Sequence, residues 1–225
     1  MEIVPGVHLL QFTFVNAFLV DDGSTLVLVD AGTPGSDRSI LAYLKGLGRS
    51  SSDVASIAIT HCHFDHTGGL AAVAQATGAQ VCASEPDAAV ISGEARQFRP
   101  PLNRPVRILG RALGAFVKPA AVRVGRILRD GDRVGPLVVV ASPGHTLGHL
   151  CYYWPERRTL FAGDSMVTQP RLRGPLEDFT EYMAEANRSL RRLAELDIDT
   201  LCVSHGAPIL AGAGVELRRM TEALA

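Results

Sequence analysis

One stretch of the sequence decides how the rest of the chain is interpreted: Thr60-His61-Cys62-His63-Phe64-Asp65-His66-Thr67-Gly68-Gly69. A strand-like run (56–60) leads into it and a helix-like run (70–76) follows it. His61 and His63 alternate as on an extended chain, so both side chains can face one point. Asp65 and His66 stand where the chain turns into the helix, and they can face a second point nearby.

This combination of imidazole and carboxylate groups suits zinc or a similar transition metal. The alternative interpretation is a surface loop that happens to be rich in histidine. However, the stretch holds three of the chain's seven histidines, and such a concentration beside an aspartate rarely arises by chance. We therefore predict a metal site that begins here.

The composition predicts a globular chain with a substantial core. The sequence has 225 residues, of which 47% are apolar and 20% charged, and its formal net charge at pH 7 is -1. This balance gives the chain as a whole no electrostatic attraction for nucleic acid, so no nucleic-acid partner is expected. The cysteines form no CxxC pair, and we expect buried free thiols at Cys62, Cys82, Cys151 and Cys202.

The amino terminus, residues 1–6, shows no basic region followed by an apolar core, which argues against a signal peptide. No apolar run approaches the length of a membrane span. We therefore expect a cytoplasmic protein, although a mature chain cut from a precursor would have the same sequence.

Apolar runs and turn signals predict a chain in which strands come first and helices follow, twice. In the first half we predict strands at 7–14, 16–21, 25–30, 56–60 and 80–84, and helices at 36–47, 70–76 and 85–92. In the second half we predict strands at 126–134, 137–142, 150–154, 159–162 and 200–204, and helices at 176–196 and 214–224. Two such halves indicate two packed sheets with helices outside.

A basic segment, residues 96–129, separates the two halves. It holds nine of the 22 basic residues and no acidic residue, whereas the rest of the chain holds 23 acidic residues. Within it, residues 105–118 fit an amphipathic helix with a basic face and an apolar face. Three interpretations stay open: a lid over the site formed by an insert at about 96–125, a helix that docks on an anionic membrane surface, and a solvated basic face.

Three more candidate ligands stand just after apolar, strand-like runs: His145, Asp164 and His205. Together with the first stretch they give five histidines and two aspartates. A mononuclear zinc site needs only three or four protein ligands, whereas seven suit two metals that share a carboxylate. We assign to the first metal His61, His63 and His145; to the second metal Asp65, His66 and His205; and to the bridge between them Asp164.

Four further residues are either supports of the site or ordinary structural residues. Asp30 follows a buried strand, and it is either a helix-entry turn residue or a support for a metal-bound histidine. We interpret His149 as structural or as a support behind the ligands, because no further ligand is needed. His8 is expected to be an ordinary strand residue. Cys62 alternates away from the neighbouring histidines, so we place it in the core.

The motif His61-x-His63-x-Asp65-His66, followed by His145, Asp164 and His205, resembles the metallo-β-lactamase superfamily over essentially the whole chain. The resemblance implies an α+β fold, a four-layer αββα sandwich of two mixed β-sheets with helices on the outer faces. It also implies a single domain, 1–225, with the metals at the sheet edges.

The amino-terminal pattern adds to this resemblance. Asn16 and the stretch Val29-Asp30-Ala31-Gly32 are similar to the family's pattern, in which the aspartate supports the metal site. The resemblance therefore favours the supporting role for Asp30.

The resemblance also implies a metal-dependent hydrolase with two Zn²⁺ ions, or alternatively Fe or Mn. Two cations that share an oxygen lower the pKa of bound water toward about 7, and the resulting hydroxide would attack a carbonyl or phosphoryl centre. Asp65 can hold a ligand position and also orient or shuttle the proton, so it is the predicted catalytic residue. We expect a small-molecule substrate with an ester, thioester, lactone or similar bond. The sequence identifies neither the substrate nor the residues that bind it. It is compatible with a dimer.

Alternative functions within the same fold stay open. A mononuclear iron dioxygenase, similar to persulfide dioxygenases, and a phosphodiesterase are the two alternatives; a non-catalytic metal-binding protein is a third class, which the full ligand set argues against. The chain also departs from several family patterns after the bridging aspartate. The stretch 165–170 lacks the Gly-Arg-Phe-Phe type of glyoxalase II enzymes, and Val167 stands where quorum-quenching lactonases carry tyrosine.

Overall fold

The computed structural model describes residues 1–96 and 119–224 of the chain. The amphipathic helix predicted at 105–118 lies outside the described residues, as does most of the basic segment. The three interpretations of that segment therefore stay predictions.

The first sheet is mixed, and its strands lie side by side in chain order. The four amino-terminal strands pair antiparallel, whereas the pairs from β4 to β7 are parallel. Its strands are β1 (Glu2–Val4), β2 (Val7–Gln11), β3 (Asn16–Asp21), β4 (Leu26–Val29), β5 (Val54–Ala58), β6 (Gln80–Ser84) and β7 (Arg126–Leu128).

The second sheet is also mixed and has the order β12-β11-β10-β9-β8. Only β11 and β12 pair parallel, while the other neighbours are antiparallel. Its strands are β8 (Arg133–Val134), β9 (Leu137–Ala141), β10 (Leu150–Trp154), β11 (Thr159–Phe161) and β12 (Thr200–Cys202).

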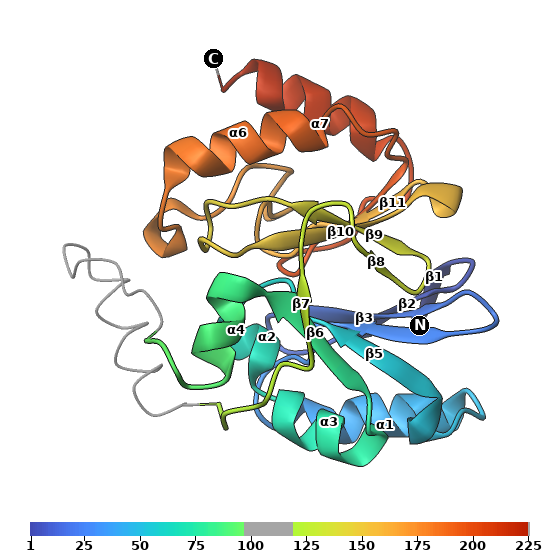
Figure 1. Ribbon diagram of the computed structural model, residues 1–225. Coiled ribbons are helices and arrows are strands. Elements are labelled where there is room, and N and C mark those ends of the chain that lie inside the picture. The colour runs from blue at the N-terminus through green and yellow to red at the C-terminus, as the bar shows by residue number, and fades with distance from the viewer. Residues whose placement is uncertain (97–118, 225) are drawn as a thin grey trace.

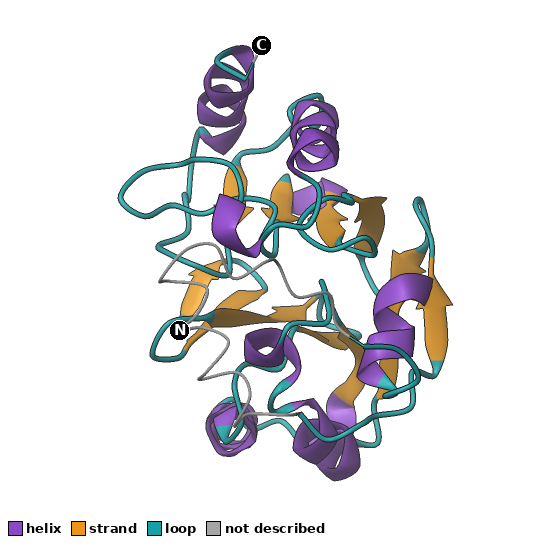
Figure 2. Ribbon diagram, turned by 90° about the vertical axis from the view of Figure 1, so that its left-hand side faces the viewer, coloured by secondary structure: helices purple, strands orange, loops and turns teal. Residues whose placement is uncertain are grey.

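The helices cover the outer faces of the two sheets (Figure 1). α1 (Ser36–Gly46) and α3 (Leu70–Thr77) lie on the outer side of the first sheet, and α6 (Met183–Leu193) and α7 (Ala213–Glu222) lie on the outer side of the second. Two shorter helices, α2 (Phe64–Thr67) and α4 (Glu85–Ile91), lie at one end of the first sheet. Viewed from that end, helices lie above and below the strands (Figure 2). Three 3-10 turns complete the described elements: η1 (Ser51–Asp53), η2 (Pro155–Arg157) and η3 (Glu177–Phe179).

Three apolar clusters fill the three interfaces between these four layers. One joins the first sheet to α1 and α3, one lies between the two sheets, and one joins the second sheet to α6 and α7. The strand β4 shows how the sequence produces this arrangement: Leu26 and Leu28 belong to the outer cluster, and Val27 and Val29 to the cluster between the sheets. A strand buried on both faces is apolar at every position. The predicted αββα sandwich is therefore confirmed.

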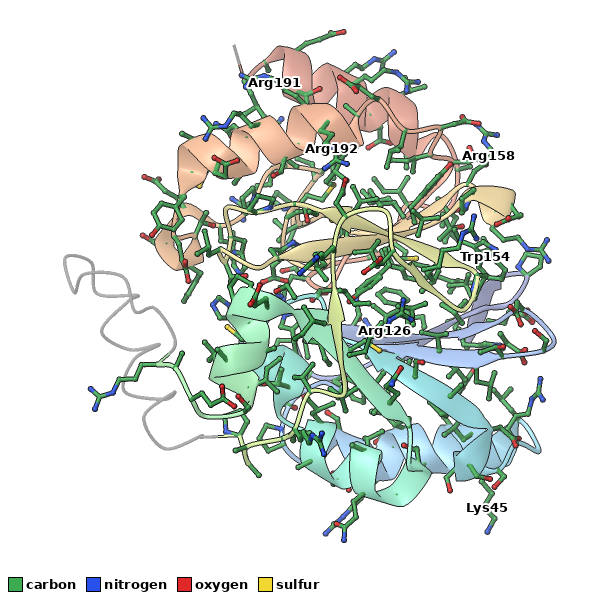
Figure 3. All side chains as sticks on the ribbon, viewed as in Figure 1. Lys45, Arg126, Trp154, Arg158, Arg191 and Arg192 are labelled. Carbon is green, nitrogen blue, oxygen red and sulfur yellow. The ribbon has the colours of Figure 1, made fainter. Side chains whose placement is uncertain are left out.

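Trp154 closes the far end of the cluster between the sheets. It is 4% exposed, and in Figure 3 it lies at the end of the molecule away from α2 and α4. The four cysteines are buried and free, as predicted. Among the described residues, no helix combines the length and apolarity that crossing a membrane requires.

Most predicted elements are present, but the single strand predicted at 126–134 is wrong. The chain forms two strands there, and they belong to different sheets: β7 pairs with β6, and β8 pairs with β9. The turn at Asp130 and Gly131 separates them, with Gly131 at a positive φ of 83°. This short stretch therefore carries the chain from the first sheet to the second.

The long helix predicted at 176–196 is also wrong in its first part. The structure has the short turn η3, then an extended stretch at Thr180, and only then α6. Thr180 is buried and its hydroxyl bonds the carbonyl of Leu176. This interruption brings Thr180 to the site described below.

Candidate metal centre

The seven predicted ligands gather at one edge of the sandwich, because each follows a strand that ends there. His61, His63, Asp65 and His66 follow β5, and the other three ligands follow three strands of the second sheet: His145 follows β9, Asp164 follows β11 and His205 follows β12. This edge lies beside α2, the turn that carries Asp65 and His66. Both sheets are needed to build the cluster.

The structure brings together the two predicted sets of three ligands, and it groups Asp164, the predicted bridge, with the first set. We call the first the histidine group (His61, His63, His145 and Asp164) and the second the mixed group (Asp65, His66 and His205). Within each group, one nitrogen or oxygen atom per residue lies within 4.8 Å of the others. Cys62 belongs to neither group; it is 6% exposed and packs in the core below the first sheet.

Asp164 lies between the two groups. Its Oδ2 is 3.5 Å from Nε2 of His145 and 3.2 Å from Nε2 of His205. Its Oδ1 is 3.3 Å from Nε2 of His66. One carboxylate therefore faces both groups, which is the position predicted for a bridging ligand.

Asp65 lies at the more open side of the mixed group. Its Oδ2 is 3.4 Å from Nε2 of His205 and 3.8 Å from Nε2 of His66. Its side chain is 17% exposed, whereas that of His66 is fully buried. Asp65 can therefore exchange protons with solvent while it stays in contact with the group.

Hydrogen bonds at Nδ1 fix the ring of His61 and that of His66. The Thr60 hydroxyl donates its proton to Oδ2 of Asp30 at 2.8 Å, so at 3.0 Å it accepts from Nδ1 of His61. Nδ1 of His66 donates to Oδ2 of Asp30 at 2.8 Å. In the neutral ring, a proton on Nδ1 leaves Nε2 with a free lone pair. Both Nε2 atoms are thus prepared to bind a cation.

The same arrangement occurs at His145 and His205. The Thr180 hydroxyl donates to the carbonyl of Leu176, so it accepts from Nδ1 of His145 at 3.3 Å. Nδ1 of His205 donates to the carbonyl of Phe14 at 2.6 Å. His63 differs, since its Nδ1 faces the centre and lies 3.1 Å from Nε2 of His145. Supports of this kind are typical of metal-binding histidines.

Buried polar atoms without hydrogen-bond partners also show that these residues fit a metal ion. Nε2 of His61, Nε2 of His66 and Oδ1 of Asp164 are buried and have no hydrogen-bond partner within residues 1–96 and 119–224. Buried polar atoms nearly always have a partner in proteins, and these three lie among nitrogen and oxygen atoms of the two groups. Divalent cations bound by the two groups would satisfy all of them.

In the mixed group, burial and the nearby carboxylates shift the histidine pKa values in opposite directions. Burial lowers the pKa of His66, but the carboxylates of Asp164, Asp30 and Asp65 outweigh burial and hold this pKa well above its usual value. In the same way, burial is outweighed at His205 by Asp164 and Asp65, and the pKa rises to about 10. Without a metal, protons on these two rings neutralise the carboxylates; a metal ion would replace those protons.

In the histidine group, by contrast, the pKa values of the histidines are lowered. Burial, together with the neighbouring rings, holds the pKa values of His61 and His145 well below the usual value. Burial also lowers the pKa of His63. These rings are therefore neutral at pH 7 and have lone pairs available for a cation.

Asp30 supports the site from a strained position. It is 1% exposed, its φ is 62°, and its Oδ1 also accepts from the backbone N–H of Thr60 at 2.8 Å. An L-residue with positive φ costs on the order of 1 kcal/mol or more, and such residues concentrate at functional sites. The loop packs closely on the motif: a Cβ added at Gly69 would lie 2.5 Å from the carbonyl oxygen of Ala31. The helix-entry interpretation alone does not explain these contacts.

His149 lies behind Asp164 and not among the ligand atoms. Its Nε2 accepts from the backbone N–H of Asp164 at 3.1 Å, so its Nδ1 carries the proton and contacts the Ser142 hydroxyl at 2.8 Å. Burial lowers its pKa to about 3, which keeps the ring neutral. His8, by contrast, lies in β2 and contacts Tyr43 far from the centre.

Sequence reasoning missed two supporting side chains and only partly identified a third. Thr60 and Thr180 bond ligand histidines, and Asn16 donates to the carbonyls of Val203 at 3.0 Å and Gly206 at 2.8 Å, on either side of His205. Thr60 directly precedes the motif, so its position was a usable signal. Thr180 carries no such signal, because it reaches the site only through the interruption before α6.

Comparison with known proteins gives a consistent result. A sequence model described as the Metallo-beta-lactamase superfamily matches residues 10–205. The chain is 28% identical to the probable metallo-hydrolase YflN of Bacillus subtilis, over 92% of this chain and 86% of that protein. It is 35% identical to a hydroxyacylglutathione hydrolase of Rhodobacter capsulatus, over 66% of this chain but only 47% of the hydrolase.

Solved structures show the same architecture. A metallo-beta-lactamase family protein from Thermus thermophilus has a TM-score of 0.68 and 27% identity, covering 99% of this chain and 79% of that chain. The protein TTHA1623, crystallised in a di-iron-bound form, has a TM-score of 0.71 and 27% identity, covering 90% and 92% of the two chains.

Proposed function

The chain belongs to the metallo-beta-lactamase superfamily of metallo-hydrolases, and from this membership we propose that it is a dinuclear zinc hydrolase of small acyl compounds. The observation that carries the proposal is the hydrogen bonding at Nδ1 of four histidines, which turns four Nε2 lone pairs toward the same edge. With Nδ1 of His63 and two carboxylates, these atoms supply two coordination groups instead of one.

The residues have separate roles in this proposal. The histidine group would hold one ion and the mixed group the other. Asp164 also faces His66 and His205 of the mixed group, so it would help to hold both ions. When bound, the two cations would lower the pKa of bound water to about 7 and polarise the oxygen of a carbonyl group.

Asp65 is the proposed catalytic residue. Burial raises its pKa, but His66 and His205 outweigh burial, so the net pKa is lowered and the carboxylate is ionised at pH 7. An ionised carboxylate that reaches solvent can orient the attacking water and accept its proton. Its partial exposure then lets that proton leave the site.

The substrate class is an ester, a thioester or a lactone. A thioester is the first compound to test, because hydroxyacylglutathione hydrolases are among the relatives. However, the chain spans only 47% to 61% of the length of two of these hydrolases, and it lacks their expected stretch after Asp164. The proposal therefore names the bond and not the hydrolases' own substrate.

Metal analysis of the purified protein, followed by a panel of thioesters, esters, lactones and phosphodiesters, tests the proposal. We expect about two zinc ions per chain and metal-dependent release of an acid from one of the acyl compounds. Iron and manganese should be measured in the same samples, since one relative was crystallised in a di-iron-bound form. One iron per chain with oxygen uptake on a thiol substrate would instead establish the dioxygenase alternative.

A further inference from the structure

Asp87 is a buried carboxylate to which the proposed reaction assigns no role. It lies in the first turn of α4 and is 3% exposed. Among the described residues, no lysine or arginine forms a salt bridge with it. Burial raises its pKa to about 6. A carboxylate buried without a cation is costly, so its contacts must explain its place.

The ordinary role of an acidic residue in the first turn of a helix is to stabilise that helix. Here the helix is capped by another residue, since the Ser84 hydroxyl accepts from the backbone N–H of Asp87 at 3.4 Å. The carboxylate of Asp87 instead makes its hydrogen bonds outside the helix. Stabilising α4 is therefore not its main task.

The carboxylate joins two loops that carry metal ligands. Its Oδ2 accepts from the Thr146 hydroxyl at 2.9 Å, and it also interacts with the thiol and backbone of Cys62. Thr146 follows His145 directly, and Cys62 stands between the two histidines that begin the motif. One side chain thus contacts the chain neighbours of all three ligand histidines of the histidine group.

These two loops come from different sheets. Cys62 follows β5 of the first sheet, and Thr146 follows β9 of the second. The contact is close: a Cβ added at Gly148 would lie 2.2 Å from the Ser84 hydroxyl oxygen and 2.9 Å from Cγ of Asp87. Only glycine lets the loop approach α4 this far.

We propose that Asp87 is a positioning residue, which holds the loop at Cys62 against the loop at Thr146 and so sets the geometry of the histidine group. Asp87 touches none of the proposed ligands itself and acts through their neighbours. This inference rests on the proposed metal centre. It predicts an effect on one of the two metal groups and not on both.

The test measures zinc affinity by competition with a chromophoric chelator, without any substrate, in the full chain. A His205→Ala background isolates the histidine group, and a His145→Ala background isolates the mixed group. Asp87→Asn and Thr146→Val should each weaken zinc binding about tenfold in the first background. In the second background the change should stay below about threefold. The double variant should be little worse than either single one, because both remove the same link.

Cobalt substitution adds a spectroscopic signature. Asp87→Asn should shift the visible absorption of cobalt in the histidine group, because the ligand geometry changes there. Thr77→Val is the matched control: Thr77 is 7% exposed and its hydroxyl bonds the carbonyl of Val73 in α3. It removes a buried hydroxyl far from the centre and should leave zinc affinity and spectrum unchanged.

The outcomes separate this inference from the proposed function. Equal weakening of both groups, or unchanged affinity in both, overturns the role of Asp87 while the metal centre stands. If the unaltered chain binds no zinc, the proposed function fails and the inference fails with it. Should Asp87→Asn not fold, Thr146→Val decides alone, because it leaves the buried carboxylate in place.

Discussion

Nδ1 of His66 lies 2.8 Å from Oδ2 of Asp30, and the two side chains are 0% and 2% exposed. The same Asp30 carboxylate accepts from the backbone N–H and the hydroxyl of Thr60. It therefore fixes His66 directly and His61 through Thr60. One residue at the end of β4 thus orients a histidine of each metal group.

Asp30→Asn tests this control of the ring orientation. The amide oxygen can keep the bond to the Thr60 N–H, so the amide nitrogen then faces Nδ1 of His66 and forces the proton onto Nε2. Asparagine tolerates a positive φ, so the backbone is preserved. We expect metal affinity in the mixed group to fall about 10-fold to 100-fold, measured by chelator competition in the His145→Ala background.

The control for Asp30→Asn is Asp130→Asn. Asp130 pairs with Arg192 at 2.6 Å on the surface, where the side chains are 45% and 51% exposed. Its replacement should leave metal affinity unchanged. Unaltered affinity in Asp30→Asn would show that Asp30 serves only the turn after β4.

Asp65→Asn tests the proposed catalytic carboxylate. The amide keeps the size of the side chain but cannot accept a proton, so kcat on an acyl substrate should fall about 100-fold or more. The circular dichroism spectrum should match that of the unaltered protein, because the side chain is not in the core. Glu216→Gln, an exposed change on α7, is the matched control, and full activity in Asp65→Asn would remove this residue from the mechanism.

Much of this centre could be predicted from the sequence because its ligands follow strands. An apolar run that ends in a polar residue marks a sheet edge, and beside the motif at 61–66 this pattern makes His145, Asp164 and His205 candidate ligands. The division into two groups followed from the spacing of the motif and from the number of ligands. The structure brings together the same two sets of three ligands and adds Asp164 to the first.

Other features depend on contacts that no local pattern shows. Thr180 bonds His145 across 35 residues, and Asp87 bonds Thr146 across 59. The split of 126–134 between two sheets was missed although Asp130-Gly131 is a turn signal in the sequence, because a turn does not show that the strand after it joins another sheet. Sequence periodicity reports which face is buried, but it does not report which sheet supplies the partner.

Metal uptake should release protons. His205, with a pKa of about 10, and His66, with a raised pKa, both carry an extra proton at pH 7 in the metal-free protein. Because a metal needs their Nε2 lone pairs, we expect about two protons to leave per chain, and affinity to fall as pH decreases. A pH indicator during zinc titration in weak buffer measures the release. His205→Gln should lower it by about one proton, and zinc uptake without proton release would contradict these pKa shifts.

Asn16→Leu tests the support of His205. The amide of Asn16 donates to two carbonyls that flank His205, and the side chain is 3% exposed. Leucine has a similar size but leaves both carbonyls without this donor, which should cost about 1–3 kcal/mol of unfolding free energy. Urea unfolding measures this loss. Metal affinity should fall in the mixed group more than in the histidine group, and an equal loss in both would limit Asn16 to a packing role.

Asp87 should also make stability depend on pH. Its pKa is about 6 in the folded chain against a usual value of 3.8, so the folded state binds this proton more tightly than the unfolded state. The stabilisation is fully present below about pH 3.8 and is lost as pH rises through about 6, by on the order of 3 kcal/mol in total. Asp87→Asn cannot titrate, so its stability relative to the unaltered chain should improve by about this amount between pH 4 and pH 7. Urea unfolding of both chains in the presence of a chelator measures the difference, because other titrating groups contribute equally to each. A difference that stays constant across this range would mean that folding does not raise the pKa of Asp87.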